Sequence, residues 1–271
     1  MLKQSMIKIT TPDNKDIYSV LYSDNRKEKV VILIHGACMN FMTGMSLFVP
    51  QMTNSFDQYD FLSVNTRAHD MGYITNGYSE REGWAWQTLE KNRYDLEATI
   101  SYLHKNGYKK IILCAHSWGG LICLDYLKNC NRNIEGIILL SPTISYRLLL
   151  EVNYRDTMVD VIQKAQKLIS ENQSNDIIIT SEKSLLPYIS AKTIYEFYNS
   201  SFEIKHVLNE LNCRVDIIIG SLEHKKLIKF GKEIAQKRDN IQTYIIKGAN
   251  HFYYGHEIEV VNIIDSILGN K

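Results

Sequence analysis

Lys110–Gly120 reads KIILCAHSWGG and joins an apolar run to a helical pattern. The run Ile111–Cys114 suits a strand that is buried on both faces, and the leucines of Leu121–Leu127 recur at the spacing of one helix face. Ser117 therefore lies on the turn between a buried strand and a helix. Gly119 and Gly120 follow Ser117, and their lack of side chains leaves room for the crowded backbone of such a turn. A serine in this position projects its hydroxyl group from the edge of the sheet, as a nucleophile must.

Five further apolar runs have the length of buried strands: they are Val30–Ile34, Phe61–Val64, Ile137–Leu140, Ile217–Ile219 and Tyr244–Ile246. Helical patterns lie between most of them, for example at Trp86–Leu103 and Val260–Ile267. Because strands alternate with helices, we predict an α/β fold with a mostly parallel sheet and helices on both of its faces. The segments Ile7–Thr10 and Ile17–Leu21 alternate about a turn, which predicts an antiparallel hairpin at one edge.

One interval, Ser141–Cys213, is far longer than the dozen or so residues that a crossover helix requires. Its apolar spacings predict helices or short strands at Val161–Ile169, Ile177–Ile179, Leu185–Ile189 and after Ser190. No repeat or low-complexity linker separates this interval from the rest of the chain. We therefore predict a core formed by residues 1–143 and 207–271, with a mainly helical cap inserted at residues 144–206.

Composition excludes several classes of function. Lys and Arg number 31 against 30 Asp and Glu, so no global basic field attracts nucleic acid or an acidic membrane. Met1–Ser5 has no apolar stretch after a basic start, and runs such as Val30–Ile34 are too short to span a bilayer, so we expect a protein that is neither secreted nor membrane-spanning. The five cysteines lack paired spacing, which favours reduced thiols and a cytoplasmic location. The histidines are scattered, so we expect no metal and no cofactor, and the oligomeric state is left open.

Three other loops follow predicted strands and carry polar groups. They are HGAC at His35–Cys38, GSLEH at Gly220–His224 and GANHF at Gly248–Phe252. Each has an ordinary structural explanation by itself: a plain turn, a solvated acid at Glu223, or a packed histidine at His251. The order in which these residues follow Ser117 is more specific than any one loop.

Ser117, Glu223 and His251 stand in the order nucleophile, acid and base, each after a predicted strand. In this order, in the elbow AHSWGG and in the HG and GANHF loops, the chain resembles the α/β-hydrolase superfamily over nearly its whole length. Ala115 departs from the usual first glycine of the elbow, and Glu223 stands where aspartate is commoner. The sequence NTRAH at Asn65–His69 replaces the frequent Asp-x-Arg-Gly-x-Gly.

The resemblance implies a role for each of these residues. Ser117 would be the nucleophile, His251 the base that accepts its proton, and Glu223 the acid that orients the imidazole and stabilises its cation. The backbone N–H groups of Ala37 and Trp118 would form an oxyanion hole, in which one donor is typically worth about 3 kcal/mol.

Asp216 is the alternative candidate for the acid. It precedes the apolar run Ile217–Ile219 rather than following it. It should therefore lie at the opposite end of the sheet from Ser117, which favours Glu223.

Cys38, Arg67 and Tyr146 are the residues that we expect to bind substrate. The expected reaction is hydrolysis of a carboxylic ester of a small or medium-sized molecule through an acyl-enzyme, without a cofactor. The long Arg67–Trp86 loop and the cap pattern resemble, loosely, a branch that contains siderophore-ester hydrolases.

Other functions stay open at this point. A thioesterase or acyltransferase that acts on a carrier-bound acyl chain would form the same acyl-enzyme, and amide, lactone or carbon–carbon cleavage is also compatible. A non-catalytic binding protein is an alternative of a different class, since the same fold hosts receptors and scaffolds.

Overall fold

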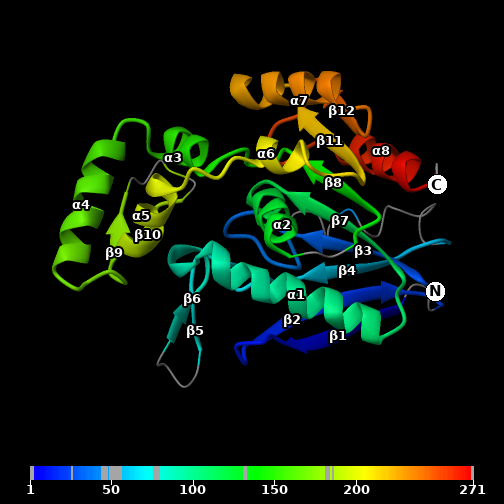
Figure 1. Ribbon diagram of the computed structural model, residues 1–271, viewed down its shortest axis with the longest axis horizontal. Helices are drawn as coiled ribbons and strands as arrows, with labels where there is room; N and C mark the ends of the chain where they lie inside the picture. Colours follow the sequence, from blue (N-terminus) through cyan, green and yellow to red (C-terminus); the bar gives the residue numbers. More distant parts are fainter. Residues whose placement is uncertain are drawn as a thin grey trace.

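The computed structural model describes residues 3–25, 27–43, 48, 57–75, 80–130, 133–180, 184 and 186–269. Its centre is an eight-stranded sheet in the order β1-β2-β4-β3-β7-β8-β11-β12 (Figure 1). The strands are β1 (Lys3–Thr10), β2 (Asp16–Ser23), β3 (Lys29–Ile34), β4 (Asp60–Val64), β7 (Lys110–His116), β8 (Gly136–Leu140), β11 (Arg214–Gly220) and β12 (Ile241–Ile246).

Strand pairing agrees with the predicted sheet. β1 and β2 form an antiparallel hairpin at one edge, with Ile9 paired to Ile17, and β2 runs antiparallel to β4. All other neighbours in this sheet are parallel. The prediction of a mostly parallel sheet with an antiparallel edge hairpin is confirmed.

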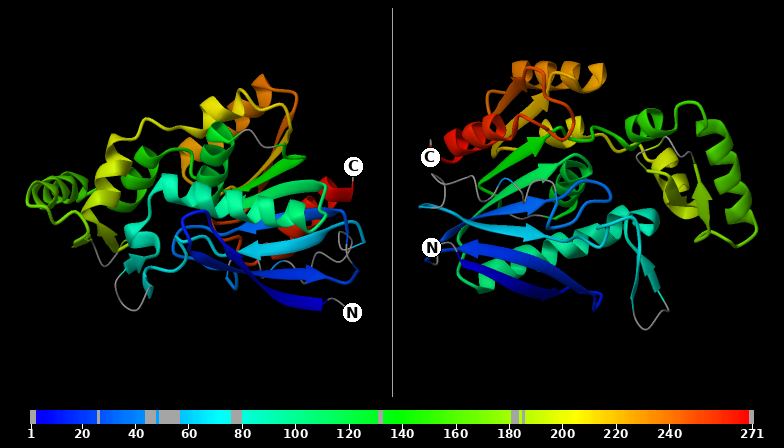
Figure 2. Two further views of the ribbon diagram at one scale, coloured as in Figure 1. Left: turned by 60° about the horizontal axis from the view of Figure 1, so that its bottom comes forward. Right: turned by 180° about the vertical axis from the view of Figure 1, so that it is seen from behind.

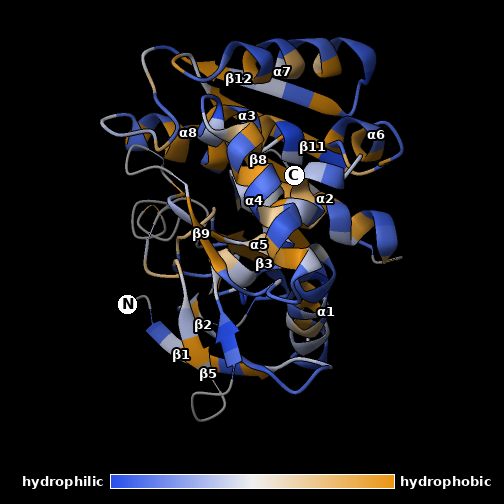
Figure 3. Ribbon diagram, turned by 90° about the vertical axis from the view of Figure 1, so that its left-hand side faces the viewer, coloured by the Kyte–Doolittle hydropathy of each residue, from blue (hydrophilic) through white to orange (hydrophobic). Residues whose placement is uncertain are grey.

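Alternating side chains of the strands supply two hydrophobic cores. Ile32 and Leu113 pack in one core with the helices α1 (Leu89–Lys105), α2 (Trp118–Asn129), α6 (Ile204–Leu208) and α7 (Lys225–Lys237). Val31 and Leu33 pack in the other core with α8 (Glu257–Gly269). The prediction of helices on both faces is therefore confirmed, and β3 and β8 are predominantly hydrophobic (Figure 3). Among the described residues, no helix is long and apolar enough to cross a membrane.

The long helix α1 begins later than the periodicity suggested. Trp84–Trp86 forms a separate 3-10 helix, η3, and the extended backbone of Thr88 (φ −134°) divides it from α1. Trp84 is buried and its ring meets that of Trp118 edge-on, with centroids 5.2 Å apart. The two tryptophans thus pack η3 against the start of α2.

The segment between β8 and β11 departs from the sheet. It contains α3 (Tyr146–Tyr154), α4 (Met158–Ser170), β9 (Ile177–Ile179), β10 (Tyr188–Ser190), α5 (Ala191–Asn199) and α6. All but α6 lie beyond the carboxyl ends of the parallel strands (Figures 1 and 2). The predicted elements at Val161–Ile169 and Ile177–Ile179 and the helix after Ser190 correspond to α4, β9 and α5, whereas α3 was not predicted.

The division into core and cap stays a proposal. Its first boundary, after residue 143, precedes α3, but its second boundary, after residue 206, falls inside α6, which packs with α2 in the core. Leu185, at the start of the predicted piece Leu185–Ile189, lies outside the described residues.

Hydrogen bonds join the inserted segment to the residues just before α1. Trp86 Nε1 donates a hydrogen bond to the Asn175 carbonyl oxygen at 2.8 Å. The Thr193 hydroxyl, at the start of α5, lies 3.1 Å from the Gln87 carbonyl oxygen. Next to these contacts, the short strands β5 (Tyr73–Thr75) and β6 (Glu80–Glu82) form a hairpin that projects from the core (Figure 1).

Candidate active site

Ser117 lies on the turn from β7 to α2 with a strained backbone. Its φ of 54° and ψ of −121° are unusual for a residue with a side chain. The Ser117 N–H donates to the Leu140 carbonyl oxygen at 2.8 Å, and the Ser117 carbonyl oxygen accepts from the Thr143 N–H at 2.9 Å. A Cβ at Gly119 would lie 2.5 Å from the His35 carbonyl oxygen, so only glycine fits there. These contacts keep the serine in its strained conformation.

Ser117, His251 and Glu223 form a continuous hydrogen-bonded chain. The Ser117 hydroxyl lies 2.9 Å from His251 Nε2, and His251 Nδ1 lies 2.7 Å from Glu223 Oε1. Since the carboxylate can only accept, the imidazole carries its proton on Nδ1, and Nε2 is left to accept from the serine. This arrangement lets a histidine act as the base for a serine nucleophile.

The loops that carry Glu223 and His251 are tied to each other. The Leu222 N–H donates to the Ala249 carbonyl oxygen at 3.0 Å, which sets the acid loop beside the histidine loop. A Cβ at Gly220 would lie 2.4 Å from the same oxygen. Glycine at this position therefore permits the close approach of the two loops.

The carboxyl group of Glu223 is suited to hold a cationic imidazole. Burial alone would raise its pKa, but the hydrogen bond and charge of His251, with a smaller contribution from Ser141, lower the pKa below its usual value. Glu223 is therefore ionised near neutral pH. Asp216 is buried on the first half of β11 and pairs with Arg214 at 2.8 Å. The geometry thus brings Glu223, and not Asp216, to His251.

The HG turn beside Ser117 is held by a neutral histidine. His35 Nδ1 donates to the Gly36 carbonyl oxygen at 2.8 Å, and His35 Nε2 accepts from the Thr66 N–H at 3.1 Å. Burial lowers the pKa of His35 to about 4, so this tautomer persists at neutral pH. Within the described part of the chain, the backbone N–H groups of Ala37 and Trp118 donate to no protein acceptor. Both are available to an oxyanion at Ser117, and that role stays a prediction.

A pocket of about 410 Å³ opens above Ser117. Most of its wall is apolar, and the inserted segment and the histidine loop supply Leu148, Leu149, Val152, Leu186 and Phe252. Among the described lining residues, Glu223 is the only acidic side chain, and lysine and arginine are absent. No group of three His, Cys, Asp or Glu side chains in the described ranges could hold a metal ion, and we assign no metal ligands.

The family model described as serine aminopeptidase, S33, matches residues 25–251. The chain belongs to this family of α/β hydrolases. The predicted superfamily and fold class are therefore confirmed. No curated protein matches the chain significantly.

Solved structures of α/β hydrolases show the same fold. The α/β hydrolase GrgF from Penicillium sp. sh18 aligns over 99% of this chain and 98% of its own, with a TM-score of 0.74 and 14% identity. Est1E from Butyrivibrio proteoclasticus, bound to ferulic acid, aligns over 97% and 98%, with a TM-score of 0.68 and 17% identity. The Pyrococcus furiosus esterase Pf2001 aligns over 99% and 93%, with a TM-score of 0.63 and 18% identity. At these identities the likeness establishes the fold and not the substrate.

Of the three residues expected to bind substrate in this hydrolase, only Cys38 lines the pocket. Its backbone has a φ of 59°, and burial raises the pKa of its thiol to about 12, so the thiol is protonated at neutral pH. Tyr146 was expected in the pocket but is buried against Phe197, with ring centroids 4.5 Å apart. The pocket-lining residues of α3, such as Leu148 and Val152, lie on another face of that helix.

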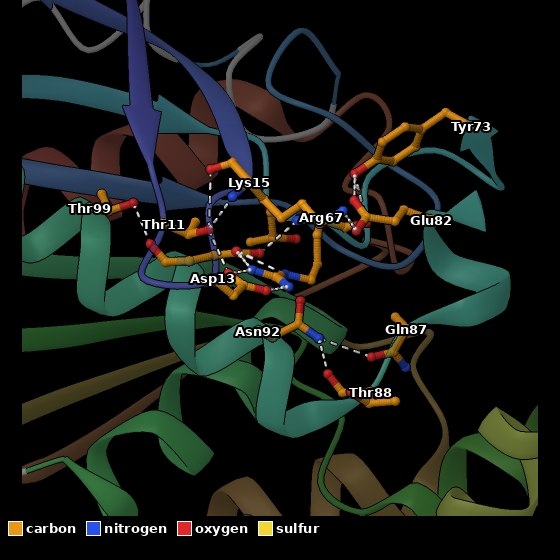
Figure 4. A network of polar contacts seen from close by, with 12 residues as sticks. Thr11, Asp13, Lys15, Arg67, Tyr73, Glu82, Gln87, Thr88, Asn92 and Thr99 are labelled. Atoms are coloured by element: carbon orange, nitrogen blue, oxygen red, sulfur yellow. Dashed lines mark hydrogen bonds and ion pairs between the residues drawn. The ribbon is translucent and has the colours of Figure 1, made fainter. Parts of the chain in front are cut away.

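Arg67 also does not line the pocket, and the expectation that it binds substrate is corrected. Its guanidinium group is 2.7 Å from Asp13, to which it points in Figure 4. It is also 2.7 Å from Asp95, and the Arg67 backbone N–H donates to the same Asp95 carboxylate. Burial alone would lower the pKa of Arg67, but these two carboxylates raise it. Arg67 is therefore a permanent buried cation that fastens the loop after β4 to α1 and to the β1–β2 turn.

Replacing Arg67 with methionine should lower the free energy of unfolding by about 3–5 kcal/mol, because Asp95 is left buried without its partner. Urea denaturation followed by circular dichroism measures this change. The double variant Arg67→Met with Asp95→Leu removes both charges and should recover part of the loss. A single variant as stable as the wild type would contradict this structural role.

His116 precedes Ser117 in the elbow, and no pattern in the sequence gives it a role. His116 is buried, and its Nε2 lies 2.9 Å from the His251 carbonyl oxygen, to which it donates. Burial lowers the pKa of His116 to about 3, so it stays neutral. It therefore holds the backbone of the histidine loop next to Ser117. Its place in the elbow was visible in the sequence, but its partner is 135 residues away.

Proposed function

We propose that the protein is a serine hydrolase that cleaves carboxylic esters of small or medium-sized, neutral substrates through an acyl-enzyme. The proposal is carried by one observation: the hydrogen-bonded chain from Ser117 through His251 to Glu223, at the base of an apolar pocket. The strained turn at Ser117 and the ionised carboxylate of Glu223 support it.

The proposed reaction begins when His251 Nε2 takes the proton of the Ser117 hydroxyl as its oxygen attacks the ester carbonyl carbon. The N–H groups of Ala37 and Trp118 stabilise the resulting oxyanion, and Glu223 stabilises the imidazolium. The imidazolium then protonates the leaving alcohol, and the acyl group stays on Ser117. A water molecule, activated by His251, releases the acid and restores the serine.

The pocket favours an ester over the N-terminus of a peptide, although the family takes its description from an aminopeptidase. An aminopeptidase must bind the ammonium group of its substrate, for which a free carboxylate is the natural partner. Glu223 is the only acid among the described lining residues, and it is already hydrogen-bonded to His251. Among the described lining residues there is also no lysine or arginine to pair with a carboxylate or phosphate, so a neutral acyl group fits best.

A graded series of p-nitrophenyl esters, from acetyl to dodecanoyl, tests this proposal. We expect the highest kcat/KM at a medium chain length, and a value at least about tenfold lower for a chain that ends in a carboxylate. Matched acyl-thioesters and aminoacyl p-nitroanilides are assayed alongside, with Ser117→Ala as the background control. A preference for thioesters by orders of magnitude would replace the ester by a carrier-bound acyl chain, and a preference for the anilides would refute the reasoning about the ammonium group.

A further inference from the structure

Asp70 lies in a backbone conformation that aspartate rarely adopts. Its φ is 54°, a value that glycine reaches without steric cost. When the loop is aligned on Arg67, Asp70 stands at the last glycine of the Asp-x-Arg-Gly-x-Gly pattern. Strain of this kind is a sign of function, and here it belongs to a carboxylate that glycine would not supply.

Asp70 contacts the HG loop, Gly36–Asn40, whose first four residues line the pocket. The Asp70 N–H donates to the Met39 carbonyl oxygen at 3.0 Å. Asn40 Nδ2 donates to Asp70 Oδ1 at 2.8 Å. The first bond uses only the backbone and is available to glycine, whereas the second requires the side chain. The carboxylate therefore fastens the far end of the HG loop.

The Asp70 carboxylate is itself held in one orientation. His69 Nδ1 donates to Asp70 Oδ2 at 2.7 Å, and the His69 ring stacks on that of Tyr73, with centroids 4.1 Å apart. Burial alone would raise the pKa of Asp70, but the hydrogen bonds from Asn40 and His69 lower it below its usual value. The group is therefore ionised at neutral pH, and an ionised acceptor strengthens the bond from Asn40.

The HG loop needs this support because it is strained where it approaches the nucleophile. Cys38 has a φ of 59°, and the Met39 N–H closes the turn with a long bond of 3.3 Å to the Gly36 carbonyl oxygen. A Cβ at Gly36 would lie 3.2 Å from the Ser117 Cβ, so the loop begins directly against the nucleophile. A strained turn with a weak internal bond keeps its shape only when the structure around it holds it.

We propose that Asp70 is a positioning residue: through Asn40 it holds the HG loop in the conformation that places the Ala37 N–H at the oxyanion. This inference rests on the proposed function, in which that N–H stabilises the tetrahedral intermediate. Asp70 is absent from the described lining of the pocket and does not touch the reacting atoms. An oxyanion donor acts mainly in the transition state, so a displaced loop should lower kcat and leave KM nearly unchanged.

Asp70→Gly removes the carboxylate and, with it, the strain of a side chain at positive φ. The backbone bond to Met39 remains available, and the partly exposed Asn40 amide can bind water instead, so the variant should fold. The matched control is Asn172→Gly, an exposed residue after α4 with a φ of 60° and no side-chain hydrogen bond among the described residues. Asp70→Asn is the conservative variant, because its amide oxygen still accepts from Asn40.

The first measurement is kcat and KM on the preferred ester. We expect Asp70→Gly to lower kcat about tenfold and to change KM by less than about twofold, a smaller effect than removal of an oxyanion donor itself. Asp70→Asn should recover kcat to within about threefold of the wild type, and Asn172→Gly should match it. The melting temperatures of both glycine variants should stay within about 4 °C of the wild type.

A coupled substitution shows whether Asp70 acts through Asn40. Asn40→Asp keeps an oxygen for the Met42 N–H, which Asn40 Oδ1 accepts at 2.9 Å, but it no longer donates to Asp70. It should lower kcat by about as much as Asp70→Gly does. In the Asp70→Gly background the same substitution should change kcat by less than about twofold, since the bond is already lost.

The second measurement follows the loop without any substrate. It is the hydrogen-exchange rate of the Met39 amide, from NMR of protein labelled with nitrogen-15 methionine, with Met39→Leu to assign the signal. Because this amide closes the turn to Gly36, its exchange reports opening of the HG loop. Asp70→Gly should exchange at least about fivefold faster than the wild type, and Asn172→Gly at the wild-type rate.

The two measurements distinguish this inference from the proposed function. A wild type that is neither labelled by a fluorophosphonate nor active on esters would refute the serine hydrolase, while unchanged Met39 exchange in Asp70→Gly would separately refute the hold on the loop. In an active protein, an unchanged kcat in Asp70→Gly would overturn the inference, and so would a loss of kcat without faster exchange. A loss of kcat that comes with a melting temperature lowered beyond 4 °C, and that persists in Asp70→Asn, would assign Asp70 to stability instead.

Discussion

Ser117→Ala should lower kcat/KM for the preferred ester on the order of 10⁵- to 10⁶-fold and abolish fluorophosphonate labelling. The hydroxyl oxygen is the atom that forms the acyl-enzyme, and no neighbouring side chain replaces it at 2.9 Å from His251 Nε2 among the described residues. Alanine keeps the Cβ that serine already holds at a φ of 54°, so the turn gains no new strain. The folded protein should therefore persist while the chemistry is lost.

The control for this experiment is Ser170→Ala, a serine at the exposed end of α4 whose hydroxyl donates to the Lys167 carbonyl oxygen and to no other acceptor in the described part of the chain. It should be labelled as fast as the wild type. If Ser117→Ala is labelled at the wild-type rate, Ser117 is not the nucleophile and the proposed function fails. If neither the wild type nor Ser170→Ala is labelled and neither cleaves an ester, the protein would be a non-catalytic binding protein with this fold.

Glu223→Gln should lower kcat about 10³- to 10⁴-fold, because the amide neither stabilises the imidazolium nor enforces the tautomer with its proton on Nδ1. Asp216→Asn should change kcat by less than about threefold, although it weakens the pair with Arg214 and so lowers stability. Steady-state kinetics of the two variants on one ester provide the comparison. The reverse order of effects would assign the acid to Asp216.

The pH dependence of stability follows from the same carboxylate. The pKa of Glu223 is lower in the folded protein than in the unfolded chain, so folding stabilises the ionised carboxylate. The stabilisation is fully present above the unfolded pKa of 4.5 and is lost as the pH falls through the lower folded value. The free energy of unfolding should therefore differ less between neutral and acidic pH in Glu223→Gln than in the wild type. Urea denaturation of both proteins at each pH measures this difference.

Much of the fold was predictable because its signals are local. Runs such as Val30–Ile34 and Ile111–Cys114 have the length and apolar character of buried parallel strands, and they became β3 and β7. Ser117, Glu223 and His251 each follow such a strand. The carboxyl ends of parallel strands meet at one edge of a sheet, so the sequence alone could anticipate that these three side chains would lie close together.

The positions of Arg67 and Tyr146 could not be predicted from the residues near them in the sequence. An arginine after a strand and a tyrosine in an insertion are both compatible with a substrate pocket, and nothing in their neighbourhoods reveals Asp95 or Phe197 as partners. The helix α3, whose residues Leu148 and Val152 line the pocket, was also missed, because its three consecutive leucines, Leu148–Leu150, show no helical spacing by themselves.

The sequence by itself determined the parallel sheet, the elbow at Ser117 and the order of the three candidate catalytic residues, since each depends on the period of a strand or on small residues at a turn. Only the tertiary structure decided that Glu223 and not Asp216 reaches His251, that Arg67 is a buried structural cation, and that His116 bonds to the His251 carbonyl oxygen. These outcomes depend on distances between residues that are far apart in the chain. Such distances arise only when the sheet, the loops and the inserted segment pack together.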